Sequence, residues 1–131
     1  MATLRTAEEG RWLRLPGRAA REILAGSSGA LAVTFRHVEI APDDGAPPRG
    51  PHVHRDFEEC IYVLEGTGVT ETATGSFPVG PGDTLLVPPG ELHVTRNTGS
   101  GPLKLLCFFP VADIGPGTRE FPSWDVARLA S

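Results

Sequence analysis

Two stretches of the sequence decide the fold: residues 51–66 read PHVHRDFEECIYVLEG, and residues 79–93 read VGPGDTLLVPPGELH. Each combines histidine or carboxylate residues with a short run of aliphatic and β-branched residues bounded by glycine and proline. Such runs are typical of short strands that end in tight turns. Because side chains alternate between the two faces of a strand, His52 and His54 should point the same way. We therefore expect strands that carry a polar site.

The rest of the chain continues this pattern of short strands. Thr74, Gly75 and Ser76 fit a hairpin turn, and residues 123–130 are expected to form one or two helical turns with Ser123 as the N-cap. Many short strands with almost no helix indicate a closed barrel or a jelly roll. The predicted strands are residues 11–15, 20–24, 30–40, 60–65, 68–73, 84–87, 92–97 and 103–109.

Composition excludes several other classes of protein. The 131 residues include 16 glycines and 13 prolines, which disfavours a helical bundle, and their 40 % apolar content disfavours disorder. The net charge of −4 comes without a basic stripe, so we expect no nucleic-acid partner. No apolar run approaches the ~20 residues that span a bilayer, and the N-terminus lacks the apolar core of a signal peptide. We expect a cytoplasmic protein of one domain, with no membrane partner and no disulfide framework.

The histidines and carboxylates of the two stretches suggest a metal site. His52 and His54 share a strand face, and His93 follows a Pro-Pro-Gly turn on a separate strand, from which it can close the site. A carboxylate from Glu58 or Glu59 would complete a ligand set of nitrogen and oxygen atoms. Such a set suits one divalent transition metal, namely iron, manganese, nickel, cobalt or zinc, and needs no thiolate.

The spacing of these residues resembles the two motifs of the cupin superfamily. From His52 the chain runs His-x-His, four residues, Glu59, six residues, Gly66. From Gly82 it runs five residues, Pro88-x-Gly90, two residues, His93, three residues, Asn97. The resemblance covers roughly residues 30–110 and includes YVLEGTG at residues 62–68. It departs from the first motif at Ala46, where a loop glycine is usual.

The resemblance implies an all-β fold, a double-stranded β-helix that forms a small jelly-roll barrel around one metal. It implies a cupin barrel over residues 30–112, between an N-terminal arm or strands at 1–29 and a C-terminal arm at 113–131. It also implies a homodimer, since cupins of this size often dimerise. The implied metal ligands are His52, His54, Glu59 and His93. The six-residue gap to Gly66 selects Glu59, with Glu58 as the alternative, and a metal-free barrel with a polar pocket is the competing interpretation.

Strand alternation also predicts which side chains line the pocket. Residues on the inward faces of their strands should surround the site, whereas Lys104 should face solvent. This pocket is largely apolar and suits a small hydrophobic or aromatic organic substrate better than a sugar phosphate. Arg36 and Arg96 are the candidates for holding an anion, although Arg96 should point away from His93. The predicted pocket-lining residues are Ile61, Val63, Thr95, Leu105, Cys107 and Phe109.

Among cupins with three histidines and one glutamate, dioxygenases are common, so the resemblance implies first an oxidoreductase of that type. A non-redox cyclase, isomerase or lyase, as in polyketide pathways, is the alternative, and a non-catalytic ligand-binding cupin is the third. The chain also resembles small cupin lyases that cleave dimethylsulfoniopropionate. Those enzymes use a tyrosine as base two residues after the glutamate ligand, where this chain has Ile61. The sequence assigns no catalytic residue.

Overall fold

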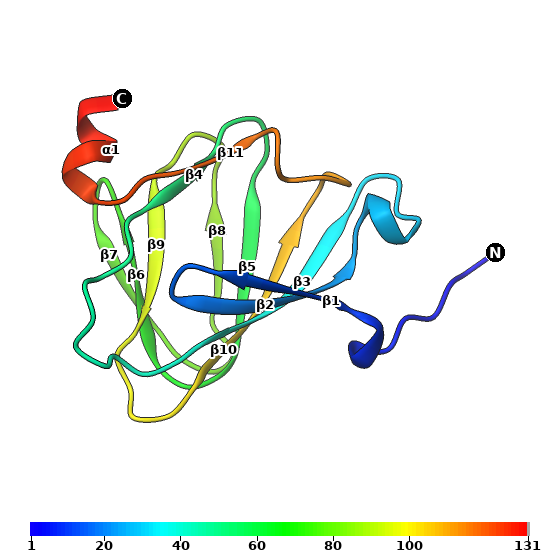
Figure 1. The fold of residues 1–131 in the computed structure, drawn as a ribbon, viewed down its shortest axis with the longest axis horizontal. Coiled ribbons are helices and arrows are strands. Elements are labelled where there is room, and N and C mark those ends of the chain that lie inside the picture. Colours follow the sequence, from blue (N-terminus) through cyan, green and yellow to red (C-terminus); the bar gives the residue numbers. More distant parts are fainter. Residues whose placement is uncertain (131) are drawn as a thin grey trace.

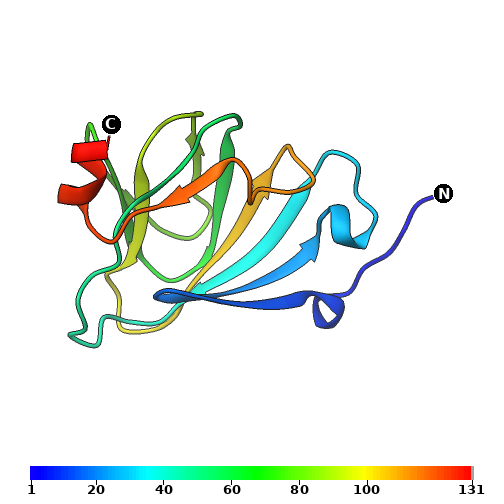
Figure 2. The same ribbon diagram turned by 45° about the horizontal axis from the view of Figure 1, so that its top comes forward.

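The computed structural model describes residues 1–130 and folds them into two antiparallel sheets that face each other (Figures 1 and 2). The six-stranded sheet has the order β1 (Arg11–Leu15), β2 (Arg18–Leu24), β3 (Thr34–Ile40), β10 (Leu103–Phe109), β5 (Glu59–Glu65) and β8 (Thr84–Val87). The five-stranded sheet has the order β11 (Thr118–Glu120), β4 (His52–His54), β9 (His93–Asn97), β6 (Gly68–Thr72) and β7 (Ser76–Val79).

Helices are short in the described part of the chain. Two are single 3-10 turns, η1 (Ala7–Glu9) and η2 (Gly26–Ser28), and one is an α-helix, α1 (Trp124–Ala130). The Oγ atom of Ser123 accepts a hydrogen bond from the Val126 N–H at 3.2 Å, so the predicted N-cap is confirmed. None of these helices is long and apolar enough to cross a membrane. The prediction of an all-β fold is therefore confirmed.

The predicted strands are present with small shifts at their ends. The run at 30–40 forms a strand only from Thr34, because η2 and the left-handed Gly29, with φ of 101°, come before it. The short strands β7 and β11 were not predicted. β7 contains Pro78, which disfavours a strand except at a sheet edge, and β7 lies at the edge of its sheet.

The first 29 residues contribute two strands to the barrel wall. β2 pairs with β3 in register, with Ala20 opposite Val38 and Arg21 opposite His37. β1 continues the same sheet through its pairing with β2. The segment expected as an N-terminal arm or strands thus extends the six-stranded sheet and supplies its fully buried Ala20 to the core.

The core lies between the two sheets and is made mainly by the inward faces of β3, β5 and β10. On β10, Leu103, Leu105, Cys107 and Phe109 are all buried, and the residues between them are not. This alternation with a period of two is the pattern that the sequence predicted for the strand. The inward side chains fill the space at one part of the barrel and leave a cavity at another.

The C-terminal segment crosses back over the barrel. β11 pairs with β4, with Thr118 opposite His54 and Glu120 opposite His52, and runs beside it in Figures 1 and 2. The Phe121 N–H donates to the Pro51 carbonyl at 3.0 Å. Gly50 lies so close to the backbone of residues 121–123 that a side chain there would collide with it. The strand that carries two histidines is therefore fixed on one side by the end of the chain.

Candidate metal centre

Four potential metal ligands come from three strands on both sheets. His52 and His54 stand on β4, and His93 stands on the neighbouring β9, directly opposite His52. Glu59 begins β5 on the six-stranded sheet and reaches them across the barrel. One ligand atom from each side chain lies within 4.8 Å of the other three. The two sheets thus bring together the four residues that the cupin motifs imply.

The Pro-Pro-Gly turn at residues 88–90 sets the position of His93. Gly90 has φ of 82°, a left-handed conformation that glycine adopts without steric strain. Its N–H donates a hydrogen bond of 2.7 Å to the carbonyl of His54. The turn that leads into β9 is therefore attached to β4. This explains locally why a turn-forming sequence precedes the third histidine.

The centre of the cluster is almost completely shielded from solvent. His54, Glu59 and His93 are 3 %, 4 % and 1 % exposed. The ring of Phe57 stacks on His54 with centroids 5.1 Å apart, and Phe109 meets the same ring edge-on at 5.2 Å. Glu58 is exposed, so Glu59 is the carboxylate that faces the histidines.

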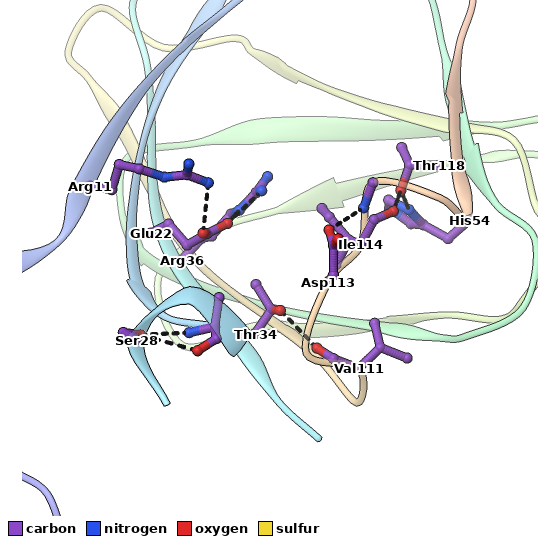
Figure 3. Close-up of polar contacts among 12 residues, drawn as sticks. Arg11, Glu22, Ser28, Thr34, Arg36, His54, Val111, Asp113, Ile114 and Thr118 are labelled. Atoms are coloured by element: carbon purple, nitrogen blue, oxygen red, sulfur yellow. Dashed lines mark hydrogen bonds and ion pairs between the residues drawn. The ribbon is translucent and has the colours of Figure 1, made fainter. Parts of the chain in front are cut away.

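Hydrogen bonds on the outer nitrogens fix the tautomers of two histidines. The Thr118 hydroxyl donates its proton to the Ile114 carbonyl at 2.6 Å, so it can only accept from the Nδ1 atom of His54 at 2.9 Å (Figure 3). Nδ1 of His93 lies 2.9 Å from the Glu91 carbonyl, which is also an acceptor. Both rings therefore carry hydrogen on Nδ1, and in the neutral form each presents a lone pair from Nε2.

Those two lone pairs point at a carboxylate. Oε1 of Glu59 lies 3.1 Å from Nε2 of His54 and 3.0 Å from Nε2 of His93. Three acceptor atoms at such distances repel one another unless positive charge lies among them. A divalent cation with nitrogen and oxygen ligands meets this requirement, so the donor set fits a metal.

His52 supports the same interpretation from the cavity side. Its Nδ1 atom is buried and has no hydrogen-bond partner among residues 1–130. Burial, followed by the neighbouring His93, lowers the pKa of His52 well below its ordinary value. The ring centroids of His52 and His93 lie 4.2 Å apart. His52 is thus held neutral beside the other candidate ligands, in the state that binds metal.

A cavity of about 400 Å³ opens onto the cluster. Five of the six side chains that the sequence placed at the pocket line this cavity: Ile61, Thr95, Leu105, Cys107 and Phe109. Val63 does not line it. Val63 faces inward as predicted, but it is only 1 % exposed and packs into the hydrophobic cluster that fills the barrel beyond Ile61. The alternation of side chains predicts which residues of a strand face inward. It does not predict how far the cavity extends along that strand.

Cys107 lies on the cavity wall opposite Arg36 in the sheet register. Its thiol is buried, and burial together with the nearby Glu59 carboxylate raises its pKa well above the ordinary value. The thiol therefore stays protonated at neutral pH. A nucleophilic role needs a thiolate, so Cys107 acts as a small wall residue.

Three arginines also line the cavity, so the prediction of a largely apolar pocket was incomplete. Arg36 lies on β3 at the same parity as buried Val38 and Ile40, a signal that could have placed it inward. Arg18 begins β2, and Arg49 lies in the proline-rich loop before β4. Nothing periodic in a loop sequence indicates where its side chains point, which is why Arg49 was missed.

Comparisons with known proteins agree with this geometry. The family model described as the cupin domain matches residues 36–109, more than half of the chain. The protein MJ1618 of Methanocaldococcus jannaschii is 43 % identical over 56 residues, which span 43 % of this chain and 45 % of that protein. The chain thus matches less than half the length of this curated relative.

Solved structures share the fold over most of the chain. The polyketide cyclase RemF of Streptomyces resistomycificus has a TM-score of 0.73 and 25 % identity, covering 99 % of this chain and 93 % of that one. An oxalate decarboxylase of Lactobacillus farciminis, in complex with formate, has a TM-score of 0.73 and 20 % identity, covering 87 % and 34 %. These matches confirm the jelly-roll barrel. With two facing antiparallel sheets, both motifs in place and a family model over residues 36–109, the chain belongs to the cupin family.

Proposed function

We propose that this cupin is a metal-dependent enzyme that acts on a small organic molecule. The observation that carries the proposal is the convergence of His52, His54, Glu59 and His93 within 4.8 Å on the wall of a 400 Å³ cavity. A bound divalent metal would act there as a Lewis acid on substrate oxygen atoms. Iron, manganese, nickel, cobalt and zinc all suit the nitrogen and oxygen donors.

The side chains around the cluster would bind and orient the substrate. Ile61, Leu105 and Phe109 offer an apolar wall, which excludes water and favours an apolar or aromatic body on the ligand. Thr95 on the same wall has its hydroxyl 2.8 Å from that of Thr70, so its orientation is fixed. These features support a small hydrophobic or aromatic substrate.

For the reaction we favour non-redox chemistry, such as cyclisation, isomerisation or bond elimination. The support is the polyketide cyclase RemF, which matches this chain almost from end to end and is similar to it in length. A dioxygenase is the second candidate. Two features support it. The three histidines and one glutamate suit iron, and the apolar wall beside them suits an aromatic substrate.

Oxygen consumption separates the two reactions. The protein would be purified without added metal, its metal content measured, and 1-phenylbutane-1,3-dione added as a chelating aromatic probe. We expect a metal-dependent shift of the enolate absorption band both with and without oxygen, and no oxygen uptake above that of the metal-free protein. Uptake of oxygen in proportion to the diketone consumed would contradict the non-redox proposal and favour the dioxygenase. A chain that binds neither metal nor diketone would instead fit a metal-free barrel.

We also propose that two copies pair through the outer face of the six-stranded sheet. Large apolar side chains gather there across neighbouring strands: Tyr62 is 40 % exposed, Leu86 59 % and Phe108 41 %. Cys60 lies opposite both Leu86 and Phe108 in the register, so these residues form one continuous patch. An exposed apolar patch on a small domain is typical of an interface, and a second copy of the same patch suits it.

The substitution Phe108→Lys is expected to convert the dimer into a monomer, because it places a charge in the centre of this patch. Light scattering after size-exclusion chromatography measures the mass directly. Phe77→Lys is the matched control, since Phe77 is 46 % exposed on β7 of the other sheet and should leave the dimer intact. A wild-type protein that runs as a monomer would refute the pairing.

A further inference from the structure

One charged side chain in the cavity, that of Arg49, forms no ion pair among residues 1–130, although Glu120 and Glu59 lie close enough to attract it electrostatically. Arg49 lies in the loop before β4, three residues ahead of His52, and lines the cavity. Its Nη2 atom donates to the Thr95 carbonyl at 3.2 Å. Its Nη1 atom is buried and has no hydrogen-bond partner among the described residues. Burial, followed by the repulsion of Arg18, lowers the pKa of Arg49 to about 10, so the guanidinium is still charged at neutral pH.

The other two arginines of the cavity are paired. The Nε and Nη2 atoms of Arg36 donate to Oε2 of Glu22 at 3.0 and 2.7 Å (Figure 3). Arg18 contacts Glu120 at 2.8 Å. Arg49 makes no ion pair of this kind within residues 1–130. A buried charge is costly without a partner, so the position of Arg49 indicates that the missing anion comes from a ligand.

The surroundings of Arg49 hold it in place for such a role. The side chain of Arg49 packs over Gly17, a left-handed residue in the β1–β2 turn, where a Cβ atom would lie 3.4 Å from Arg49 Cδ. The next residue, Gly50, is pressed against the backbone of residues 121–123. An arginine whose side chain packs on a turn and whose backbone neighbour is fixed loses less entropy when it binds a ligand, which favours a preformed anion site.

We propose that Arg49 binds an anionic oxygen of the substrate, a carboxylate or an enolate, beside the metal centre. This rests on the proposed function and names its substrate class: an organic oxyanion with an apolar body. Arg49 and His52 lie close enough to interact electrostatically, as Arg49 contributes to the low pKa of His52 after burial and the other histidine neighbours. One end of the substrate would therefore contact the guanidinium while its apolar part lies on Ile61, Leu105 and Phe109.

Benzoate and benzamide test the proposal, because the two molecules have nearly the same shape and only benzoate is charged. Their dissociation constants would be measured by ligand-observed NMR on zinc-loaded protein of known metal content. We expect benzoate to bind wild-type protein about tenfold tighter than benzamide or more, as charge-assisted hydrogen bonds to arginine imply. In Arg49→Gln this preference should fall about tenfold, and in Arg49→Lys it should be kept in part.

The matched control is Arg14→Gln, which removes the same charge from an exposed arginine on β1 that does not line the cavity. Its preference for benzoate should be unchanged. Equal binding of benzoate and benzamide by the wild type would overturn the proposal, as would an unchanged preference in Arg49→Gln. The wild-type comparison is repeated on metal-free protein, so that a benzoate preference due to zinc is separated from one due to Arg49. If the wild type retains no zinc, the proposed function fails, and the same comparison on the metal-free protein still tests Arg49 by itself.

Discussion

The Glu59→Gln variant is expected to lose its bound metal. Its metal affinity should fall by more than the roughly 10- to 100-fold that follows when a hydrogen-bond partner of a metal ligand is removed. Glutamine keeps the size of the side chain but removes the negative charge and turns one oxygen into an N–H donor. The cluster would then offer neutral ligands alone to a dication, inside a site where Glu59 is 4 % exposed. Metal content after purification and competition with a chelator measure the effect.

Glu58→Gln is the control for that experiment. Glu58 is the adjacent carboxylate and is exposed, so its substitution should leave the metal content equal to that of the wild type. Together the two variants decide which of the two candidate glutamates, Glu59 or Glu58, binds the metal. Metal loss in Glu58→Gln with retention in Glu59→Gln would reverse the assignment of the site.

The Thr118→Val variant is expected to weaken metal binding about 10- to 100-fold, the usual cost of removing a partner of a metal-binding histidine. Valine has nearly the shape of threonine but cannot accept the Nδ1–H of His54, which now bonds to Thr118 Oγ1 at 2.9 Å. The His54 ring would be free to take the other tautomer, with hydrogen on Nε2 and no lone pair toward Glu59. If the ring instead kept its hydrogen on Nδ1, that buried N–H would have no partner, at a cost of about 1–3 kcal/mol in the free energy of unfolding.

Thr118→Ser separates the hydrogen bond from packing. Serine keeps the hydroxyl that links His54 to the Ile114 carbonyl, so its metal affinity should stay near that of the wild type. Metal titration followed by calorimetry measures all three proteins, and thermal unfolding of the metal-free forms reports their stability. A valine variant that binds metal as tightly as the wild type would show that the tautomer does not depend on Thr118.

Local patterns were sufficient to predict most strands, and the resemblance to the cupin motifs implied the four candidate ligands. His52 and His54 are two residues apart on one strand, and the turn before His93 is visible as Pro-Pro-Gly. Strand alternation also placed Ile61, Leu105 and Phe109 on the cavity wall. These features depend on periodicity and turn chemistry, which a sequence contains directly.

Contacts between distant segments could not be predicted in this way. Thr118 is 64 residues from His54, and its role follows only from the pairing of β11 with β4. Arg49 lies in a loop without any periodic pattern. Only the structure shows that Arg18 and Arg36 form ion pairs with carboxylates and that Arg49 forms none among residues 1–130. The charge of the pocket was therefore misjudged, although its apolar wall was not.

The pairing of β11 with β4 has a consequence for how the protein is made. The histidines and Glu59 all lie before residue 94, yet the residue that sets the tautomer of His54 is Thr118. During synthesis the four candidate ligands leave the ribosome before Thr118 does. A nascent chain ending before β11 would leave the tautomer of His54 unset, so we expect tight metal binding only after β11 has paired with β4.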